Sequence, residues 1–203
     1  MSTALVFTIV LTSMMNKIIL LWLIPAGLIS ALYTIPFVRV NGSWWRLRDI
    51  GYFKTLLIAL TVTFVTVYLP IIDAGNEIIV ISMETALICA ERFFFIMCIT
   101  IPFDIRDLKL DEKMGLKTIP SLLGVKKSLA LSIVFLAFFV VTFLYHFAST
   151  DFMSLAVFMA LLASAIVTAF IVIYSTPNRT EYFFSFLVEG TMVIQFLFLL
   201  LAY

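Results

Sequence analysis

The sequence has few charged residues. Only 12% of its 203 residues are Asp, Glu, Lys or Arg, whereas 64% are hydrophobic. A soluble domain is about half apolar and about a quarter charged, so this composition excludes a water-soluble fold. The 13 basic and 12 acidic residues nearly balance, which gives no reason to expect a nucleic acid partner. The partners of this chain must be sought in the lipid bilayer.

Cysteine is also scarce. The two cysteines, Cys89 and Cys98, lie nine positions apart in one apolar stretch. That separation is too long for a disulfide within one helix. We interpret both as buried thiols and infer no redox compartment from them.

Long apolar runs are abundant. A helix needs about 20 apolar residues to span a bilayer, and lipid satisfies no backbone hydrogen bonds, so the runs must be helical. We predict an all-α fold, a polytopic transmembrane helical bundle that forms one domain over residues 1–203. The seven predicted helices cover residues 3–15, 18–37, 53–72, 78–103, 128–147, 152–174 and 182–203. The first is shorter than a span, but no basic residue precedes it and no small-residue cleavage pattern follows it, which argues against a signal peptide.

Basic residues fall on one side of this predicted bundle. By the positive-inside rule that side is cytoplasmic. The rule places the amino terminus and the 104–127 loop in the cytoplasm and Tyr203 outside, as expected for a multi-pass protein of the cell membrane. Lys17 stands alone on the external side. The basic residues on the predicted cytoplasmic side are Arg39, Arg46, Arg48, Lys54, Arg106, Lys109, Lys113, Lys117, Lys126, Lys127 and Arg179.

Three acids in the predicted 104–127 loop have helical spacing. Asp104, Asp107 and Asp111 are three and then four positions apart, which places them on one face of a helix. Each is followed two positions later by a base, about 200° around the axis, so we expect acids and bases not to pair. Stacked carboxylates repel by roughly 0.2–0.5 kcal/mol per pair and need a counter-ion. Oxygen ligands favour Mg²⁺, which completes its shell with water and substrate phosphates. A solvated charged loop is the alternative.

The residues that follow these acids make the prediction more specific. Residues 107–124 read DLKLDEKMGLKTIPSLLG. This segment resembles the second conserved motif of UbiA-type prenyltransferases, a D-x-x-x-D followed by G-x-K-T-x-P-x-x-x-G. A looser similarity includes the segment from Tyr33 to Arg39, which resembles the tyrosine and basic residues after the family's fourth helix. Glu189 and Gly190 stand where the family's last helix often carries an acid and a glycine.

The resemblance implies a membrane-embedded transferase of isoprenoid groups. Enzymes of this type are transferases of alkyl or aryl groups other than methyl, and they move a polyprenyl group from an allylic diphosphate to an aromatic or quinone-precursor acceptor. It implies Mg²⁺ as the cofactor, with Asp104, Asp107 and Asp111 as catalytic metal ligands. The candidate residues for substrate binding are Lys117, Arg39, Arg46, Arg48, Lys54 and Tyr33.

The family's first motif, N-x-x-x-D-x-x-x-D, is absent from the sequence. On this resemblance the chain corresponds to the last seven of nine helices and lacks two N-terminal helices. Half of the implied metal site is then missing. We expect the chain alone to have little activity.

Polar residues within the predicted helices leave two other function classes open. Glu84, Glu91, Arg92 and Glu189 could form the polar pathway of a transporter or channel, contact neighbouring helices, or bind an acceptor. We interpret His146 as an interfacial residue near the external end of its helix. A catalytically inactive interaction subunit is a further alternative, supported by the missing motif. The densest acid cluster lies at a membrane edge, whereas transporter sites lie near the midplane, so we favour the enzyme.

Overall fold

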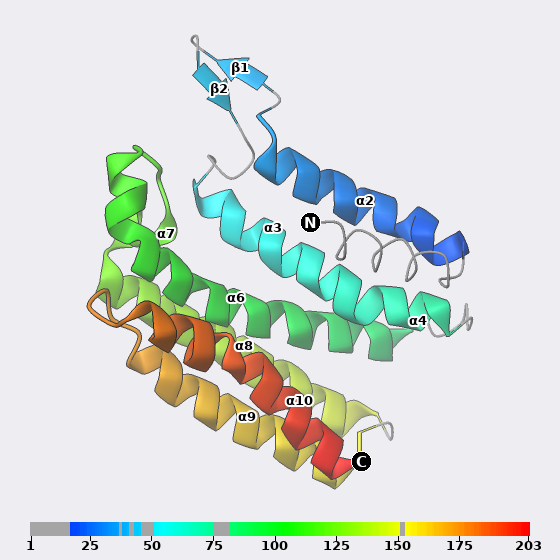
Figure 1. The fold of residues 1–203 in the computed structure, drawn as a ribbon. Coiled ribbons are helices and arrows are strands. Elements are labelled where there is room, and N and C mark those ends of the chain that lie inside the picture. Colours follow the sequence, from blue (N-terminus) through cyan, green and yellow to red (C-terminus); the bar gives the residue numbers. More distant parts are fainter. Residues whose placement is uncertain (1–16, 37, 41–42, 46–50, 75–81, 151–152) are drawn as a thin grey trace.

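The computed structural model of the chain describes residues 17–36, 38–40, 43–45, 51–74, 82–150 and 153–203 (Figure 1). Almost all of these residues are helical, which confirms the predicted all-α bundle. The exception is a hairpin of two antiparallel strands, in which Val38 pairs with Trp45. The α-helices are α2 (Lys17–Thr34), α3 (Gly51–Thr63), α4 (Leu69–Asp73), α6 (Met83–Lys113), α7 (Ile119–Leu123), α8 (Val125–Ser149), α9 (Leu155–Ile173) and α10 (Gly190–Ala202). The π-helical turns are η2 (Phe64–Tyr68) and η3 (Phe183–Val188), and the strands are β1 (Val38–Val40) and β2 (Ser43–Trp45).

Five helical stretches in the described part of the chain are long and apolar enough to cross a membrane. They are Phe53–Asp73, Met83–Lys113, Val125–Ser149, Leu155–Ile173 and Phe183–Ala202. Each corresponds to a helix predicted from an apolar run. The helix predicted at 18–37 is present as α2, whose apolar part Leu20–Tyr33 is shorter. The helix predicted at 3–15 lies outside the described residues.

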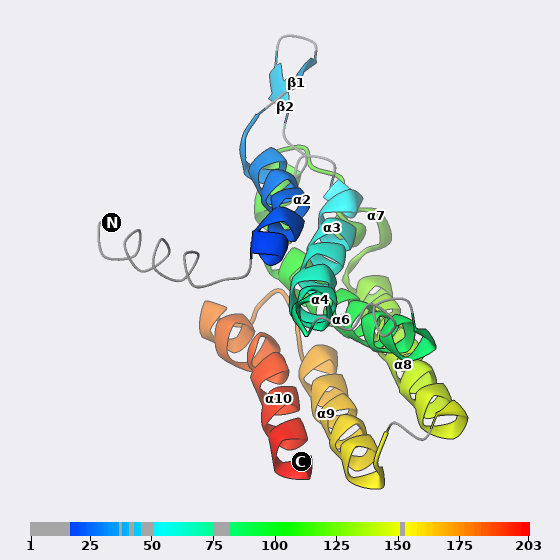
Figure 2. The same ribbon diagram turned by 90° about the vertical axis from the view of Figure 1, so that its right-hand side faces the viewer.

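Helix α6 is the centre of the bundle. It packs against α8 along most of its length and against α3 on another side. Helix α9 packs between α8 and α10, and η3 returns to contact α6. Figure 2 shows α9 and α10 on one side of α6 and α2 and α3 on the other. Aromatic contacts join the helices within the core, with Phe95 on α6 in contact with Phe139 on α8, and Phe143 beside Phe139.

Helix α6 is longer than predicted. The predicted helix ended at residue 103 and a loop followed, but α6 continues to Lys113 through Pro102. Proline cannot donate the backbone hydrogen bond to the carbonyl four residues earlier, which here belongs to Cys98. The Ser132 hydroxyl of α8 donates to that carbonyl instead. Because a neighbouring helix satisfies the freed group, the proline does not end the helix. At roughly 1.5 Å per residue its 31 residues reach beyond the hydrocarbon layer, and the aspartates lie in this extension.

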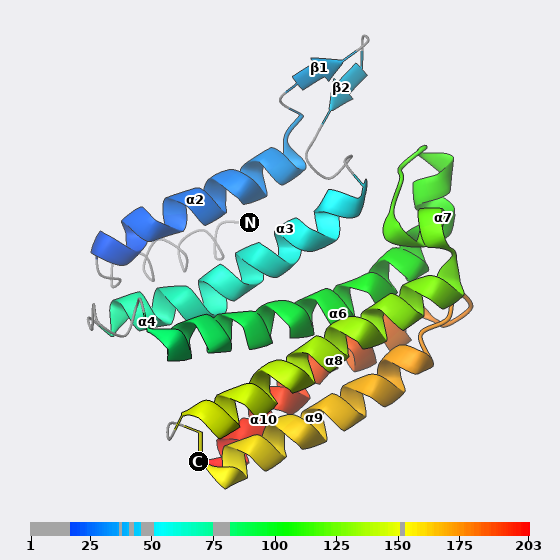
Figure 3. The same ribbon diagram turned by 180° about the vertical axis from the view of Figure 1, so that it is seen from behind.

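The two ends of the bundle differ in charge. The hairpin, the start of α3, α7 and the connection from α9 to η3 lie at one end, and α4, the start of α6 and the carboxyl terminus lie at the other (Figure 3). The described end that holds α7 carries Lys54, Arg106, Lys109, Lys113, Lys117, Lys126, Lys127 and Arg179. Eight of the eleven basic residues that the sequence assigned to one side therefore lie at one end of the described structure.

Candidate active site

The three aspartates lie on the last turns of α6, in different environments. Asp104 and Asp111 are buried, with exposed fractions of 2% and 4%. The side chain of Asp107 is 29% exposed. Residues seven positions apart lie on the same face of a helix, so the two buried carboxylates face the same side of α6.

Asp104 is held by two residues of α3. Lys54 places its Nζ atom 3.1 Å from Oδ1, and the Thr55 hydroxyl donates a hydrogen bond to Oδ2 over 2.7 Å. Lys54 also interacts electrostatically with Asp111 and with Tyr33 of α2. One cation from α3 therefore pairs with Asp104 and is within electrostatic range of Asp111 and Tyr33.

Asp107 is paired, contrary to the prediction that these acids and bases lie apart. The Arg106 Nε atom donates to Oδ1 over 2.7 Å, and Nη2 donates to Oδ2 over 3.0 Å. The angular separation along the helix did not prevent this contact, because an arginine side chain is long enough to fold along the helix surface to the adjacent residue. The guanidinium also lies over the Phe103 ring, 5.1 Å from its centroid.

Two buried oxygens of the conserved-looking segment have no hydrogen-bond partner in the described part of the chain. They are Oδ2 of Asp111 and Oγ1 of Thr118. A buried polar atom without a partner costs about 1–3 kcal/mol, so these two oxygens are available to a ligand or to water. Thr118 stands at the N-cap of α7, where its side chain makes no capping bond.

A glycine turn connects these two positions. Gly115 has a φ of 70°, which is costly for residues with a Cβ atom. Its N–H bonds to the Glu112 carbonyl, and the Leu116 N–H bonds to the Asp111 carbonyl. This pair of bonds is a Schellman motif. It ends α6 and turns the chain toward α7.

The site fits a metal ion only in part. No three His, Cys, Asp or Glu side chains among the described residues gather as a metal cage. Both oxygens of Asp104 and of Asp107 already have partners. Mg²⁺, however, takes one or two protein carboxylates together with substrate phosphates. The unpaired oxygen of Asp111 suits that mode of binding.

The other candidate residues do not all join this cluster. Lys117 is exposed in the turn before α7. Arg39 lies in β1, where its backbone pairs with Trp44. Arg46 and Arg48 lie outside the described residues. Of the predicted substrate-binding residues, Lys54 contacts one of the acids, and Tyr33 is within electrostatic range of Lys54.

A cavity of about 270 Å³ begins at the Lys54–Asp104 pair. We call it the Lys54 cavity. It runs between α3, α6 and the start of α10, and its far end is formed by Val62 and Ile96. The α3 wall runs from Lys54 to Val62 and the α6 wall from Asp104 to Ile96. Each is eight residue steps, so the cavity is about 12 Å long at roughly 1.5 Å per residue. The lining residues are Lys54, Thr55, Ile58, Val62, Ile96, Ile99, Thr100, Phe103, Asp104, Glu189 and Met192.

The model of the UbiA prenyltransferase family matches residues 1–197. The chain belongs to the UbiA prenyltransferase family. No curated protein and no solved structure gives a significant match to it. Membership in the UbiA family and the five apolar spans together identify a membrane protein of the prenyltransferase type.

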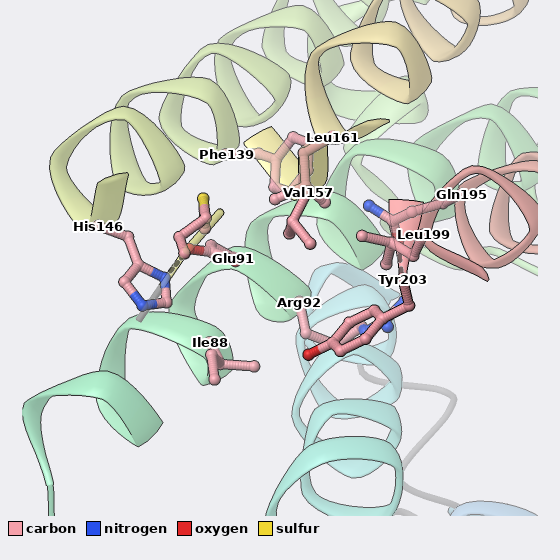
Figure 4. Close-up of a pocket in the computed structure, with 11 residues that line it drawn as sticks. Ile88, Glu91, Arg92, Phe139, His146, Val157, Leu161, Gln195, Leu199 and Tyr203 are labelled. Carbon is pink, nitrogen blue, oxygen red and sulfur yellow. Dashed lines mark hydrogen bonds and ion pairs between the residues drawn. The ribbon is translucent and has the colours of Figure 1, made fainter. Parts of the chain in front are cut away.

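A second cavity of this UbiA family member lies toward the other end of the bundle. We call it the His146 cavity, and its volume is about 250 Å³. Figure 4 shows Glu91 and His146 on one side of it and Arg92, Gln195 and Tyr203 on the other. The remaining lining residues are Ile88, Phe139, Met153, Val157, Leu161 and Leu199.

The interpretation of His146 as interfacial was wrong. Its side chain is 2% exposed, and Nδ1 lies 2.8 Å from Oε1 of Glu91. Arg92 donates from Nη1 to Oε1 of Gln195 over 3.0 Å. Glu91 and Arg92 therefore reach different helices, α8 and α10, which confirms that they contact neighbouring helices. In a bilayer each polar residue needs a partner of this kind.

Sequence reasoning missed Thr55 and Ser132. Both are small polar residues inside apolar runs and both are buried, with exposed fractions of 1% and 0%. A hydroxyl in a membrane helix can bond to its own backbone four residues earlier, so its presence indicates no long-range partner. Pro102 was a usable signal, because a proline inside a membrane helix frees a carbonyl that a neighbouring donor must satisfy.

Proposed function

We propose that this chain is a UbiA-type prenyltransferase that binds an allylic prenyl diphosphate with its diphosphate near Lys54 and Asp111 and its prenyl chain in the Lys54 cavity. The observation that supports this most is the distribution of polarity in that cavity. Its charged residues stand at the α7 end of the bundle, and apart from the hydroxyls of Thr55 and Thr100 the rest of the lining is hydrocarbon. A prenyl diphosphate has the same distribution of polarity, because its charged diphosphate stands at one end of a hydrocarbon chain. We further propose an aromatic or quinone-precursor acceptor.

The proposed reaction transfers the prenyl group through an allylic cation. The bond between the allylic carbon and the diphosphate oxygen breaks, and its electron pair leaves with the diphosphate. An electron-rich carbon of the acceptor then forms the new bond and loses a proton. Lys54 stabilises the charge that develops on the departing oxygen, and preorganised charge of this kind is a large catalytic term. Lys117 is the proposed second contact to the diphosphate.

Mg²⁺ is the proposed cofactor. Asp111 would hold it through its unpaired oxygen, with Asp107 and Asp104 as the further proposed ligands. When bound, the metal neutralises charge on the diphosphate. For Asp107 to take part, Arg106 must release it, and the partly exposed position of this pair favours that exchange because ion pairs in contact with water are weak. We propose that this end of the bundle faces the cytoplasm of a cell membrane.

A transporter is less well supported. Transporter sites are formed by discontinuous helices near the midplane, whereas α6 runs through Glu91 and Arg92 without a break. These two residues bond to α8 and α10. These two charges are therefore accounted for by contacts with neighbouring helices.

The test is transfer of labelled geranyl or farnesyl diphosphate to a panel of aromatic acceptors in membranes. The chain alone should turn over little donor, because one carboxylate group binds fewer bridging metals than two facing groups. The same chain joined to two helices that carry N-x-x-x-D-x-x-x-D should be active, and Asp107→Asn with Asp111→Asn should abolish that activity. An extended chain indifferent to both changes would end the case for these ligands. Strong turnover by the short chain would show that the first motif is dispensable.

A further inference from the structure

The two cavities are neighbours along one interface. Ile96 and Met192 line the far end of the Lys54 cavity, and Arg92 and Gln195 line the His146 cavity. Arg92 is four residues before Ile96 on α6, and Gln195 is three residues after Met192 on α10. One helical turn, about 5.4 Å, therefore separates the two cavities on each helix.

The Arg92–Gln195 hydrogen bond crosses this boundary. It joins α6 to α10 over 3.0 Å, and Gln195 is only 3% exposed. On the α3 side, Val62 reaches the same end of the Lys54 cavity. A hydrocarbon chain that enters beside Lys54 and extends away from it therefore meets a polar barrier after about 12 Å.

We propose that the Arg92–Gln195 pair is the floor of the donor site and sets the longest prenyl chain that the site accepts. This inference rests on the proposed function. A chain that ends above the floor contacts Val62, Ile96 and Met192. A longer chain must push into a hydrogen-bonded pair that has been removed from water, where an unpaired polar group is costly. Beyond the floor, the His146 cavity provides about 250 Å³ of further space.

The prediction concerns variants that remove the floor. Gln195→Ala removes the acceptor of the bond and opens a passage from the Lys54 cavity to the His146 cavity. Gln195→Ala alone leaves the Arg92 guanidinium unpaired and can therefore misfold. Arg92→Ala combined with Gln195→Ala opens the same passage without an unpaired guanidinium, so the test does not depend on the single variant. Gln195→Glu is the matched control, because a carboxylate of the same length still accepts from Arg92.

The measurement is competition binding of non-reactive thiolo analogues of geranyl, farnesyl and geranylgeranyl diphosphate to the detergent-solubilised chain with Mg²⁺. The readout is the ratio of the Kd values for the geranylgeranyl and geranyl analogues. Because micelle partitioning of each analogue is the same for every variant, it cancels when the ratios of two variants are compared. The ratio should fall by about tenfold in Gln195→Ala and in the double variant, which is the size of the penalty for forcing extra groups into a packed space.

Each outcome has a distinct meaning. The Gln195→Glu ratio should equal that of the unmodified chain. If both opened variants keep the original ratio, the floor lies elsewhere and the inference is wrong, while the proposed function stands. If the unmodified chain binds none of the three analogues, the proposed function fails and the inference falls with it.

Discussion

Replacing Lys54 by methionine should reduce both stability and donor binding, and a second substitution at Asp104 should separate the two effects. At the observed 3.1 Å from Asp104, the Coulomb attraction is about 5 kcal/mol at an effective dielectric constant near 20. Desolvation offsets most of this, and a charged hydrogen bond contributes roughly 1.5–3 kcal/mol net. Because Lys54 is 21% exposed, water partly compensates its loss. Lys54→Met should lower the free energy of unfolding by about 1–3 kcal/mol, since it leaves the Asp104 carboxylate without its cation.

The same variant should weaken binding of prenyl diphosphate by about 10- to 150-fold, the equivalent of one charged hydrogen bond. Adding Asp104→Asn should restore stability, because the buried charge is gone and Thr55 keeps an acceptor. It should not restore donor binding. Thermal unfolding and donor competition in detergent with Mg²⁺ measure the two effects, and Lys126→Met, a charge removal at an exposed site, is the control. A double variant that binds donor like the original chain would refute a role for Lys54 at the diphosphate.

Two further predictions concern the bundle itself. Cysteines introduced at Lys113 and Tyr203 should be labelled from opposite sides of the membrane, with Lys113 cytoplasmic; labelling of both from one side would contradict the topology. Ser132→Ala should lower thermal stability by about 1 kcal/mol, because the Cys98 carbonyl that Pro102 leaves free then has no donor. Ser149→Ala, at an exposed position, should have no such effect. Equal losses of stability in both variants would show that the bond from Ser132 to the Cys98 carbonyl contributes nothing specific.

Much of the fold could be predicted because apolar runs determine where membrane helices form. The prediction at 128–147 is α8, Val125–Ser149, and the prediction at 152–174 is α9, Leu155–Ile173. The end of α6 was wrong because Pro102 and the charges after it are typical of a helix end. Their effect was overridden by Ser132 on α8 and by two residues of α3. Such tertiary compensation is not encoded in the local sequence.

The candidate site could be predicted only where its residues are close in the sequence. The spacing predicted one helix face for all three aspartates, and the structure buries Asp104 and Asp111 on the same face but leaves Asp107 partly exposed and paired with Arg106. Lys54 was a weak candidate, because the positive-inside rule alone accounts for a lysine there, and its contact with Asp104 joins distant parts of the chain. The same reason hid the pairing of Glu91 with His146, which lie 55 positions apart.

The central position of α6 has a consequence for how the protein is made. It is the least apolar of the five candidate spans, because it carries Glu91 and Arg92 within its length. An isolated charged residue at a helix centre opposes insertion by roughly 2.5–3.5 kcal/mol. The partners that relieve this penalty, His146 on α8 and Gln195 on α10, are synthesised after α6. We therefore expect stable integration of α6 to follow the synthesis of α8 and α10.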